Sequence, residues 1–282
     1  MFRSLLFIPG NNPSMLQNAD VFLADAIIID LEDAISIKEK NNARNLVHNY
    51  LTTSSVLPKQ IVLRVNSVDS KWFKKDIDLL KTGKINYLLI PKVDYKTMVE
   101  VDSLLDEYLT ENKLEEIKII ALVETAKGIV EIDEFAENKR LCAILLGAED
   151  LTSDLEIKRT ESNDEIFYAR SKVIFSCAAN RLIPIDTPFT NINDIKGLEK
   201  DSLGSNTLGM KARACIHPNQ LEVVNRIYSP SVEDIKWAQE VYKAHQENPD
   251  LGAFQLKGKM IDKPIIERAK KIIDKARIFD LM

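Results

Sequence analysis

The amino-acid sequence predicts an α/β protein folded as a closed (β/α)8 barrel, a TIM barrel, with a C-terminal helical extension. Three observations predict this fold. Short apolar runs rich in β-branched residues recur along the chain, a polar turn follows each run, and a longer amphipathic segment follows each turn. Strands that alternate with helices imply right-handed βαβ units. Eight such units within 282 residues are typical of a closed barrel.

The apolar runs are the expected strands of the barrel. They cover residues 5–8, 26–29, 61–63, 87–90, 117–123, 143–146, 183–185 and 212–216. Several are almost continuously apolar, which is typical of parallel strands that are covered on both faces. The helices between them are expected over residues 13–24, 36–51, 71–80, 96–109, 128–136, 164–181, 192–203 and 218–227. An open doubly wound sheet is the alternative, but no GxGxxG turn follows the first strand.

The C-terminal part of the chain does not fit a further strand–helix repeat. We expect residues 1–228 to form the barrel and residues 229–282 to form the helical extension. One helix is expected from Ser231 to about His245, and the last begins at Pro264. The helical pattern is interrupted at Pro249, Gly252 and Gly258. An extension of this length is expected to complete the active site or to contact a neighbouring subunit.

Composition and charge narrow the class of protein. Hydrophobic residues make up 45% of the chain and charged residues 29%, so a folded core is expected rather than disorder. The net charge is −5 and no basic stripe is present, so nucleic acid is not an expected partner. The three cysteines show neither a disulfide nor a zinc pattern. No stretch is apolar enough for a signal peptide or a membrane span, so we expect a cytoplasmic protein.

Polar side chains follow the predicted strands at their C-terminal ends, where barrels of this type carry their active sites. They include Asp30, Glu32, Asp33, Arg64, Asn66, Lys92, Glu124, Glu149, Asp150 and Asp186. Any one of them is also consistent with a helix cap or a solvated loop. Together they crowd carboxylates around one rim, which is unfavourable unless a cation neutralises them. Oxygen ligands without a His or Cys cluster favour Mg²⁺ over Zn²⁺.

A series of short strings occurs in a fixed order along these strand ends. The strings are RSLLFIPGNNPSM, DLEDAISIKEKNNAR, LRVNS, PKV, VETAKGI, LGAEDL, YAR, DTP, CIHPNQ and, in the tail, GKMIDKPIIERAK. In this order they resemble the citrate lyase β-subunit family, which also contains citramalyl-CoA, malyl-CoA and related 3-hydroxyacyl-CoA lyases. A string of three residues is a weak signal, but the collinear order across nearly the whole chain is specific.

The resemblance implies a Mg²⁺-dependent retro-Claisen or Claisen reaction on an acyl thioester. Glu124 and Asp150 match the two direct metal ligands of the family, and Arg64 matches the arginine that binds the carboxylate of the substrate. Asp262 matches the aspartate that reaches the active site of a neighbouring subunit and exchanges a proton with the enolate carbon. A homo-oligomer, a trimer or a multiple of one, is therefore expected.

The chemistry explains why these residue types are needed. Cleavage beside a 3-hydroxyl group leaves a keto acid and a thioester enolate. Mg²⁺ on Glu124 and Asp150 is expected to chelate the hydroxyl and carboxylate oxygens and to act as a Lewis acid. Arg64 is expected to pair with the carboxylate in bidentate fashion, and Asp262 to act as the general acid. Glu124 thus has both a substrate-binding and a catalytic role.

Structural alternatives exist for two of these assignments. Arg64 could be a rim residue that pairs only with Asp30 or Glu32, and Asp262 could belong to the cap of the last helix. Two alternative functions also remain: a class II keto-acid aldolase, for which the rim offers only His217, and a citryl-carrier-protein lyase subunit of a citrate lyase complex.

The carrier of the thioester is the least determined feature. Residues 209–213 read GMKAR, where the family usually has a Gly-Phe-x-Gly-Lys string, although Arg213 keeps a cation there. Free coenzyme A and the phosphopantetheine arm of an acyl carrier protein are both compatible with the sequence, because no adenine or phosphate motif is recognisable.

Overall fold

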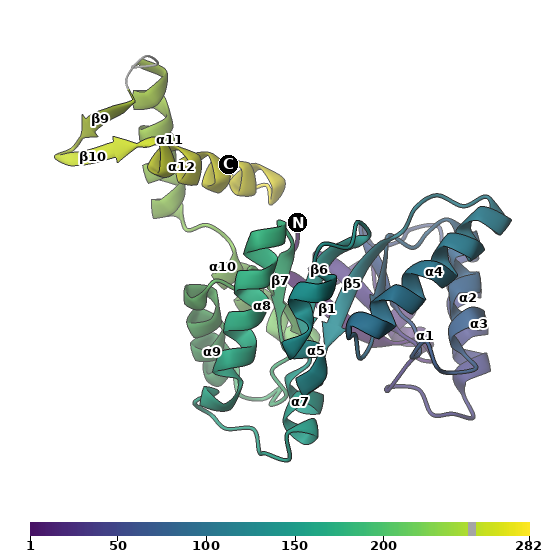
Figure 1. The fold of residues 1–282 in the computed structure, drawn as a ribbon. Helices are drawn as coiled ribbons and strands as arrows, with labels where there is room; N and C mark the ends of the chain where they lie inside the picture. Colours follow the sequence, from purple (N-terminus) through teal and green to yellow (C-terminus); the bar gives the residue numbers. More distant parts are fainter. Residues whose placement is uncertain (248–251) are drawn as a thin grey trace. The chain divides into compact units, whose positions relative to one another are not determined.

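The computed structural model, which describes residues 1–247 and 252–282, contains a closed barrel of eight parallel strands in the order β1 to β8 (Figure 1). The strands are β1 (Ser4–Pro9), β2 (Ala26–Asp30), β3 (Ile61–Arg64), β4 (Tyr87–Ile90), β5 (Lys118–Val123), β6 (Leu141–Leu146), β7 (Ile183–Asp186) and β8 (Ala212–Cys215). β1 pairs with both β2 and β8, which closes the barrel. The predicted fold class is confirmed.

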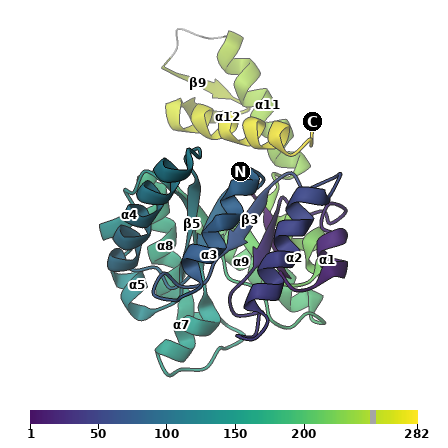
Figure 2. The same cartoon turned by 90° about the vertical axis from the view of Figure 1, so that its right-hand side faces the viewer.

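The helices alternate with the strands and lie outside the barrel (Figures 1 and 2). They are α1 (Pro13–Gln17), α2 (Lys40–Thr53), α3 (Phe73–Ile77), α4 (Tyr95–Asn112), α5 (Ala126–Val130), α6 (Ile132–Phe135), α7 (Ala148–Asp154), α8 (Phe167–Asn180), α9 (Ile195–Leu208) and α10 (Leu221–Tyr228). Short 3₁₀ helices cover Asp78–Thr82, Asp164–Ile166 and Pro218–Gln220. Several details differ from the sequence prediction: the helix expected over 13–24 ends at Gln17, the one expected over 71–80 divides into α3 and a 3₁₀ helix, α5 and α6 replace one helix over 128–136, and α7 was not expected.

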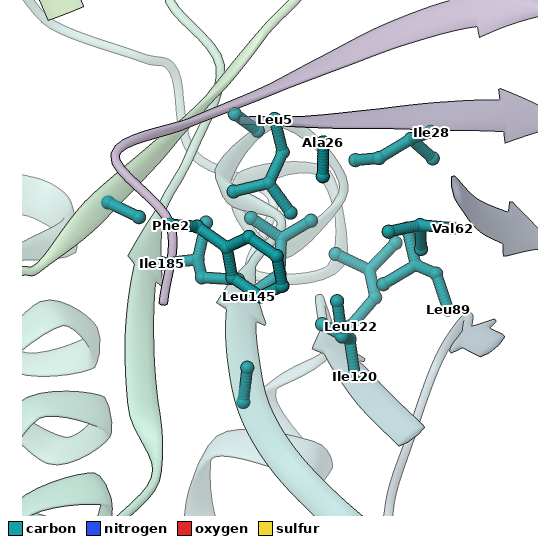
Figure 3. Close-up of a cluster of buried hydrophobic side chains, with 13 residues drawn as sticks. Phe2, Leu5, Ala26, Ile28, Val62, Leu89, Ile120, Leu122, Leu145 and Ile185 are labelled. Atoms are coloured by element: carbon teal, nitrogen blue, oxygen red, sulfur yellow. The ribbon is translucent and has the colours of Figure 1, made fainter. Parts of the chain in front are cut away.

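The interior of the barrel is filled by alternate residues of the strands (Figure 3). Along β5, Ile120 and Leu122 belong to this cluster, and along β6 Ala143 and Leu145 do. This alternation is expected because successive side chains of a strand point to opposite faces. The other buried members are Phe2, Leu5, Ala26, Ile28, Val62, Leu89, Ile185, Ala212 and Ala214. A packed interior of this kind holds the strand ends, and the side chains on them, in place.

The chain divides into two compact units, Phe2–Asn225 and Arg226–Met282 together with Met1, and the division falls within α10. The second unit contains α11 (Val232–Glu247), β9 (Ala253–Leu256), β10 (Lys259–Asp262) and α12 (Lys263–Ile278). Both tail helices were predicted, and the expected interruption at Pro249 lies outside the described residues. The β9–β10 hairpin was not predicted.

The hairpin turns through Lys257 and Gly258, whose φ angles are +46° and +77°. Two consecutive residues with positive φ are typical of the tight turn whose twist matches that of paired antiparallel strands. Ile261 of β10 then packs with Ala238 and Val241 of α11 and with α12. The described residues contain no helix that is both long and apolar enough to cross a membrane.

Candidate active site

The C-terminal rim of the barrel gathers the charged residues that the sequence placed at strand ends. Asp30 is the last residue of β2, Arg64 the last of β3, and Glu124 directly follows β5. Gly147 directly follows β6, and α7 begins at the next residue. Asp150 lies in the first turn of α7. Parallel strands of a barrel all end at the same rim, and this brings residues far apart in the sequence together.

Arg64 is held from two sides by the barrel rim. Its Nε donates to Oδ1 of Asp30 at 2.7 Å and its Nη2 donates to Oδ2 at 2.6 Å. The guanidinium lies over the ring of Phe7, 5.2 Å from the ring centroid. Asp30 itself is fixed, because its carboxylate accepts hydrogen bonds from the backbone N–H groups of Glu32 and Ala34. The geometry of this pair is therefore set by β2, β3 and the turn after β2.

The Nη1 group of Arg64 faces two further carboxylates. It lies 3.1 Å from Oε2 of Glu32 and 3.4 Å from Oδ2 of Asp33. The contact with Glu32 is an ion pair without hydrogen-bond geometry, and the buried Oε2 has no hydrogen-bond partner among the described residues. Arg64 thus pairs with Asp30 and Glu32, the contacts expected if it were a structural residue of the rim. Its expected role in substrate binding stays a prediction.

Glu124 and Asp150 come together as the sequence predicted. Glu124 is 2% exposed, its Oε1 accepts the backbone N–H of Lys92 at 3.0 Å, and Asp150 is near enough for its charge to raise the pKa of the Glu124 carboxyl group. Gly147 makes room for this arrangement, because a Cβ there would lie 2.6 Å from Cβ of Glu124. The glycine of the LGAEDL string is thus a site residue that sequence reasoning missed, although its position beside Asp150 was a usable signal.

The electrostatics of the rim reflect an excess of negative charge. Burial, with a further contribution from the neighbouring carboxyl group of Asp150, raises the pKa of Glu124 to about 9. Burial also raises the pKa of Glu32 to about 7, against the lowering effect of Arg64 and with smaller contributions from Asp33 and Asp30. Carboxyl groups are held protonated in this way when no cation offsets their mutual repulsion.

The same residues fit a hard divalent cation. Glu124 and Asp150 follow neighbouring strands and offer only carboxylate oxygens, a donor type that suits Mg²⁺. Within the described residues no group of three or more His, Cys, Asp or Glu side chains has metal-binding geometry. Glu124 and Asp150 would therefore hold Mg²⁺ as a pair, and water or substrate oxygens would complete the coordination. Mg²⁺ commonly keeps several waters when bound by one or two carboxylates.

Asp262 is not part of this cluster in the described chain. It belongs to the C-terminal unit, ends β10 and caps α12, where its Oδ1 accepts the backbone N–H of Ile265 at 3.3 Å. Asp262 therefore does cap the last helix, which was the structural alternative to a catalytic role. Capping leaves the second carboxylate oxygen available for other contacts, so the expected catalytic role stays a prediction.

Three residues noted in the sequence make structural contacts. Asp186, at the end of β7, is fully buried and accepts hydrogen bonds from Arg170 and Arg213. Arg213 of β8 is itself fully buried and also donates to Asp201 of α9. His217 caps the 3₁₀ helix after β8, and its Nδ1 accepts the backbone N–H of Asn219 at 3.2 Å. Arg213 is therefore not presented to a substrate, whereas His217 is exposed and uses its Nδ1 in the cap.

A cavity of about 750 Å³ lies beside α7. Its described lining includes Glu149, Arg159, Phe167 and Phe189, but not Glu124, Asp150 or Arg64. Glu149 pairs with Arg159 at 3.0 Å, which ties the loop before α8 to the metal-site helix α7. Glu149 is thus a salt-bridge partner of Arg159.

Comparison with known proteins identifies the family of the chain. The model of the HpcH/HpaI aldolase/citrate lyase family matches residues 3–218. The chain is 34% identical to the citrate lyase subunit beta of Leuconostoc mesenteroides subsp. cremoris, over 96% of this chain and 92% of that protein. It is 30% identical to human mitochondrial citramalyl-CoA lyase, over 96% of this chain and 84% of that protein.

Among solved structures, the chain is similar to the CitE protein of Mycobacterium tuberculosis in complex with magnesium, acetoacetate and coenzyme A. The identity is 28%, the TM-score is 0.77, and 97% of each chain is covered. The family resemblance drawn from the ordered strings is thereby confirmed. This chain belongs to the HpcH/HpaI aldolase/citrate lyase family.

Proposed function

We propose that this protein is a Mg²⁺-dependent carbon–carbon lyase that cleaves a 3-hydroxyacyl thioester into an acyl thioester and a keto acid. The substrate is of the citramalyl-CoA, citryl-CoA or malyl-CoA type. One observation carries the proposal: Glu124 and Asp150 follow the neighbouring strands β5 and β6 at one rim of the barrel, where the charges of Asp150 and Arg64 both act on the Glu124 carboxyl group. Membership of the family and the activities named for its relatives support the same reaction class.

The metal site is proposed to consist of Glu124 and Asp150. When bound there, Mg²⁺ supplies Lewis-acid stabilisation of oxygen atoms on the keto-acid side of the substrate. Glu124 is the buried member of the pair: its carboxylate accepts the backbone N–H of Lys92, and Gly147 leaves room for its side chain. Asp150 is exposed at the start of α7 and completes the pair from the solvent side.

Arg64 is proposed to bind the carboxylate of the keto-acid portion. Asp30 occupies the Nε and one side of Nη2, so the substrate has to meet the edge formed by Nη1 and the other side of Nη2. That edge now faces Glu32 and Asp33, and Asp33 is exposed enough to move aside. A carboxylate there would still form two parallel hydrogen bonds with one guanidinium.

Asp262 is proposed to donate the proton to the enolate carbon, from the C-terminal unit of a neighbouring subunit. The expected homo-oligomer follows from this role, because Asp262 belongs to a different compact unit from the barrel. A carboxyl group at the end of a hairpin can both cap α12 and present its second oxygen outward. We also propose a cytoplasmic location, which the three free cysteines support.

A second candidate function is the lyase subunit of a citrate lyase complex acting on a carrier-bound citryl thioester. The relatives named citrate lyase subunit beta favour it. It uses the same residues, so only the carrier and the acyl group differ. A class II aldolase is less well supported, because the only histidine of the predicted rim, His217, is engaged in a helix cap.

The test is a panel of 3-hydroxyacyl-CoA esters incubated with the purified protein and Mg²⁺, with and without an acyl carrier protein. We expect release of a keto acid and an acyl-CoA from one ester, measured by chromatography, and loss of this activity in Glu124→Ala. Glu149→Ala is the matched control, since Glu149 lies beside Asp150 on α7 but pairs with Arg159. Equal turnover in excess EDTA, or an active Glu124→Ala variant, would contradict the proposal.

A further inference from the structure

Lys92 lies on the barrel rim between Arg64 and Glu124. β4 pairs with β3 on one side and with β5 on the other. Arg64 ends β3, Glu124 directly follows β5, and Lys92 comes two residues after the end of β4. Parallel strands of a barrel all end at one rim, so the three residues follow one another around it. The sequence placed Lys92 among the polar residues at strand ends but predicted no role for it.

The backbone of Lys92 is in the left-handed region. Its φ angle is +52°, a conformation that residues other than Gly, Asn and Asp seldom adopt. In this conformation its N–H donates to Oε1 of Glu124 at 3.0 Å. Glycine would meet the same backbone requirement at a lower conformational cost. A lysine at this position therefore points to a use for its side chain.

The ammonium group of Lys92 is not paired with a carboxylate. The side chain is exposed, and no carboxylate lies within ion-pair distance of it in residues 1–247 and 252–282. Its positive charge lowers the pKa of Glu32 against the effect of burial, and Glu32 lies 3.1 Å from Nη1 of Arg64. Arg64 itself faces three carboxylates. The rim therefore has one cation that is already compensated and a second, Lys92, that is not.

The proposed reaction creates a negative charge that no residue has yet been assigned to stabilise. When the carbon–carbon bond breaks, its electron pair moves onto the thioester portion and the charge collects on the thioester oxygen. The hydroxyl oxygen becomes the carbonyl of the keto acid as its proton passes to solvent. Arg64 is assigned to the carboxylate of the keto-acid portion, and the proton from Asp262 goes to carbon. A preorganised cation at the thioester oxygen would stabilise the transition state.

We propose that Lys92 is a catalytic residue whose ammonium group contacts the thioester oxygen of the substrate and stabilises the enolate. The assignment rests on the proposed function. An ammonium group suits this role because it is a compact point charge with three donors on a flexible stem. The hydrogen bond from its N–H to Glu124 fixes the start of that stem beside the proposed metal site.

Replacement by glycine separates the side chain of Lys92 from its backbone. Lys92→Gly keeps the N–H and accepts a positive φ, so it removes only the ammonium group and its stem. Lys113→Gly is the matched control, since Lys113 is also an exposed lysine with a φ angle of +54°. It ends α4, ahead of β5 and away from the C-terminal rim. Neither variant should melt below the wild type in differential scanning fluorimetry.

Steady-state kinetics tests the role of the ammonium group on the ester that the wild type cleaves. In Lys92→Gly kcat should fall about a hundredfold with little change in KM, because the charge on the thioester oxygen forms only in the transition state. Lys92→Arg keeps a cation and should be more active than Lys92→Gly. Lys113→Gly should have the wild-type kcat. An unchanged kcat in Lys92→Gly, or a raised KM at unchanged kcat, would overturn this inference and leave the proposed function standing.

Mg²⁺ binding gives a measurement that does not depend on turnover. In isothermal titration Lys92→Gly should bind Mg²⁺ as tightly as the wild type or more tightly, because the N–H to Glu124 is retained and a nearby cation is removed. Weaker Mg²⁺ binding in Lys92→Gly would mean that Lys92 acts through Glu124, and would overturn the assignment to the thioester oxygen. If the wild-type protein cleaves no thioester, the proposed function fails and this inference fails with it.

Discussion

At the scale of single residues, the rim combines charges that are unfavourable together. Burial, together with the nearby carboxyl group of Asp150, raises the pKa of Glu124 to about 9. When the pKa of a carboxyl group is higher in the folded state than in the unfolded state, the free energy of unfolding decreases as the pH rises from the unfolded pKa to the folded pKa. For Glu124 this interval runs from 4.5 to about 9, and for Glu32 from 4.5 to about 7.

We therefore predict that Mg²⁺ stabilises the fold more strongly at high pH. Mg²⁺ binds the deprotonated pair, so its effect on the melting temperature should grow from about pH 6 to about pH 8.5. Differential scanning fluorimetry with and without Mg²⁺ measures this. In Glu124→Gln the Mg²⁺ effect should vanish, while the metal-free protein should be more stable than the wild type at the higher pH. The same Mg²⁺-induced shift at both pH values would refute the assignment of the site.

Asp262 allows capping and catalysis to be separated. Asn is as good an N-cap as Asp, so Asp262→Asn should leave the stability nearly unchanged, whereas Asp262→Ala should lower the free energy of unfolding by about 1 kcal/mol. A general acid requires the carboxyl group, so both variants should lose most of their turnover. Urea denaturation and keto-acid release measure the two effects. Full activity in Asp262→Asn would show that the residue only caps α12.

At the scale of elements, buried ion pairs join the second half of the barrel to its helices. Asp186 of β7 receives Arg170 from α8 and Arg213 from β8, and Asp201 of α9 contacts both arginines. The two arginines keep the pKa of Asp186 below its ordinary value although burial opposes this. Four elements therefore depend on one network, which positions β7 and β8 relative to α8 and α9.

Removing one charge from this network should be strongly destabilising. We predict that Asp186→Asn lowers the free energy of unfolding by about 3 kcal/mol, because it leaves two buried arginines with less compensation. The exposed pair of Lys81 and Asp78 is the comparison, and Lys81→Gln should change the stability by less than about 1 kcal/mol. Urea denaturation of both variants at neutral pH gives the two values. A loss for Asp186→Asn as small as that for Lys81→Gln would mean that the network contributes little.

At the scale of the whole molecule, the proposed catalyst is divided between two compact units. Arg64, Glu124 and Asp150 belong to Phe2–Asn225, and Asp262 belongs to the unit that begins at Arg226. The expected boundary between residues 228 and 229 stays a prediction, as does the role of the extension. If Asp262 serves a neighbouring subunit, two inactive variants can complement each other.

We predict that co-expressed Glu124→Ala and Asp262→Ala subunits regain activity that neither has alone. In a cyclic oligomer with random mixing, about one quarter of the sites should combine an intact Glu124 with an intact Asp262 from the neighbour. Turnover of the mixed oligomer is compared with that of each pure variant, and light scattering gives the oligomeric state. Activity that stays absent in the mixture would argue for an Asp262 that acts within its own subunit, or not at all.

Much of the architecture follows from local sequence. Continuous apolar runs such as residues 26–29 are compatible only with strands covered on both faces, and the spacing of these runs implied eight βαβ units, as found. The convergence of Glu124 and Asp150 was also predictable, because both follow neighbouring strands of one barrel. The β9–β10 hairpin was missed because its single turn signal, Gly258, was interpreted only as a helix breaker.

The sequence by itself determined the barrel, the family and the identity of the paired carboxylates, because these depend on periodicity and on the order of residues along the chain. Only the tertiary structure decided what surrounds each charge. It placed Asp30 against Arg64, buried Arg213 beside Asp186, and brought Arg44 to Trp72. The physical reason is that burial and the distance between charges depend on contacts between elements far apart in the chain, and these contacts set both the pKa and the partners of a side chain.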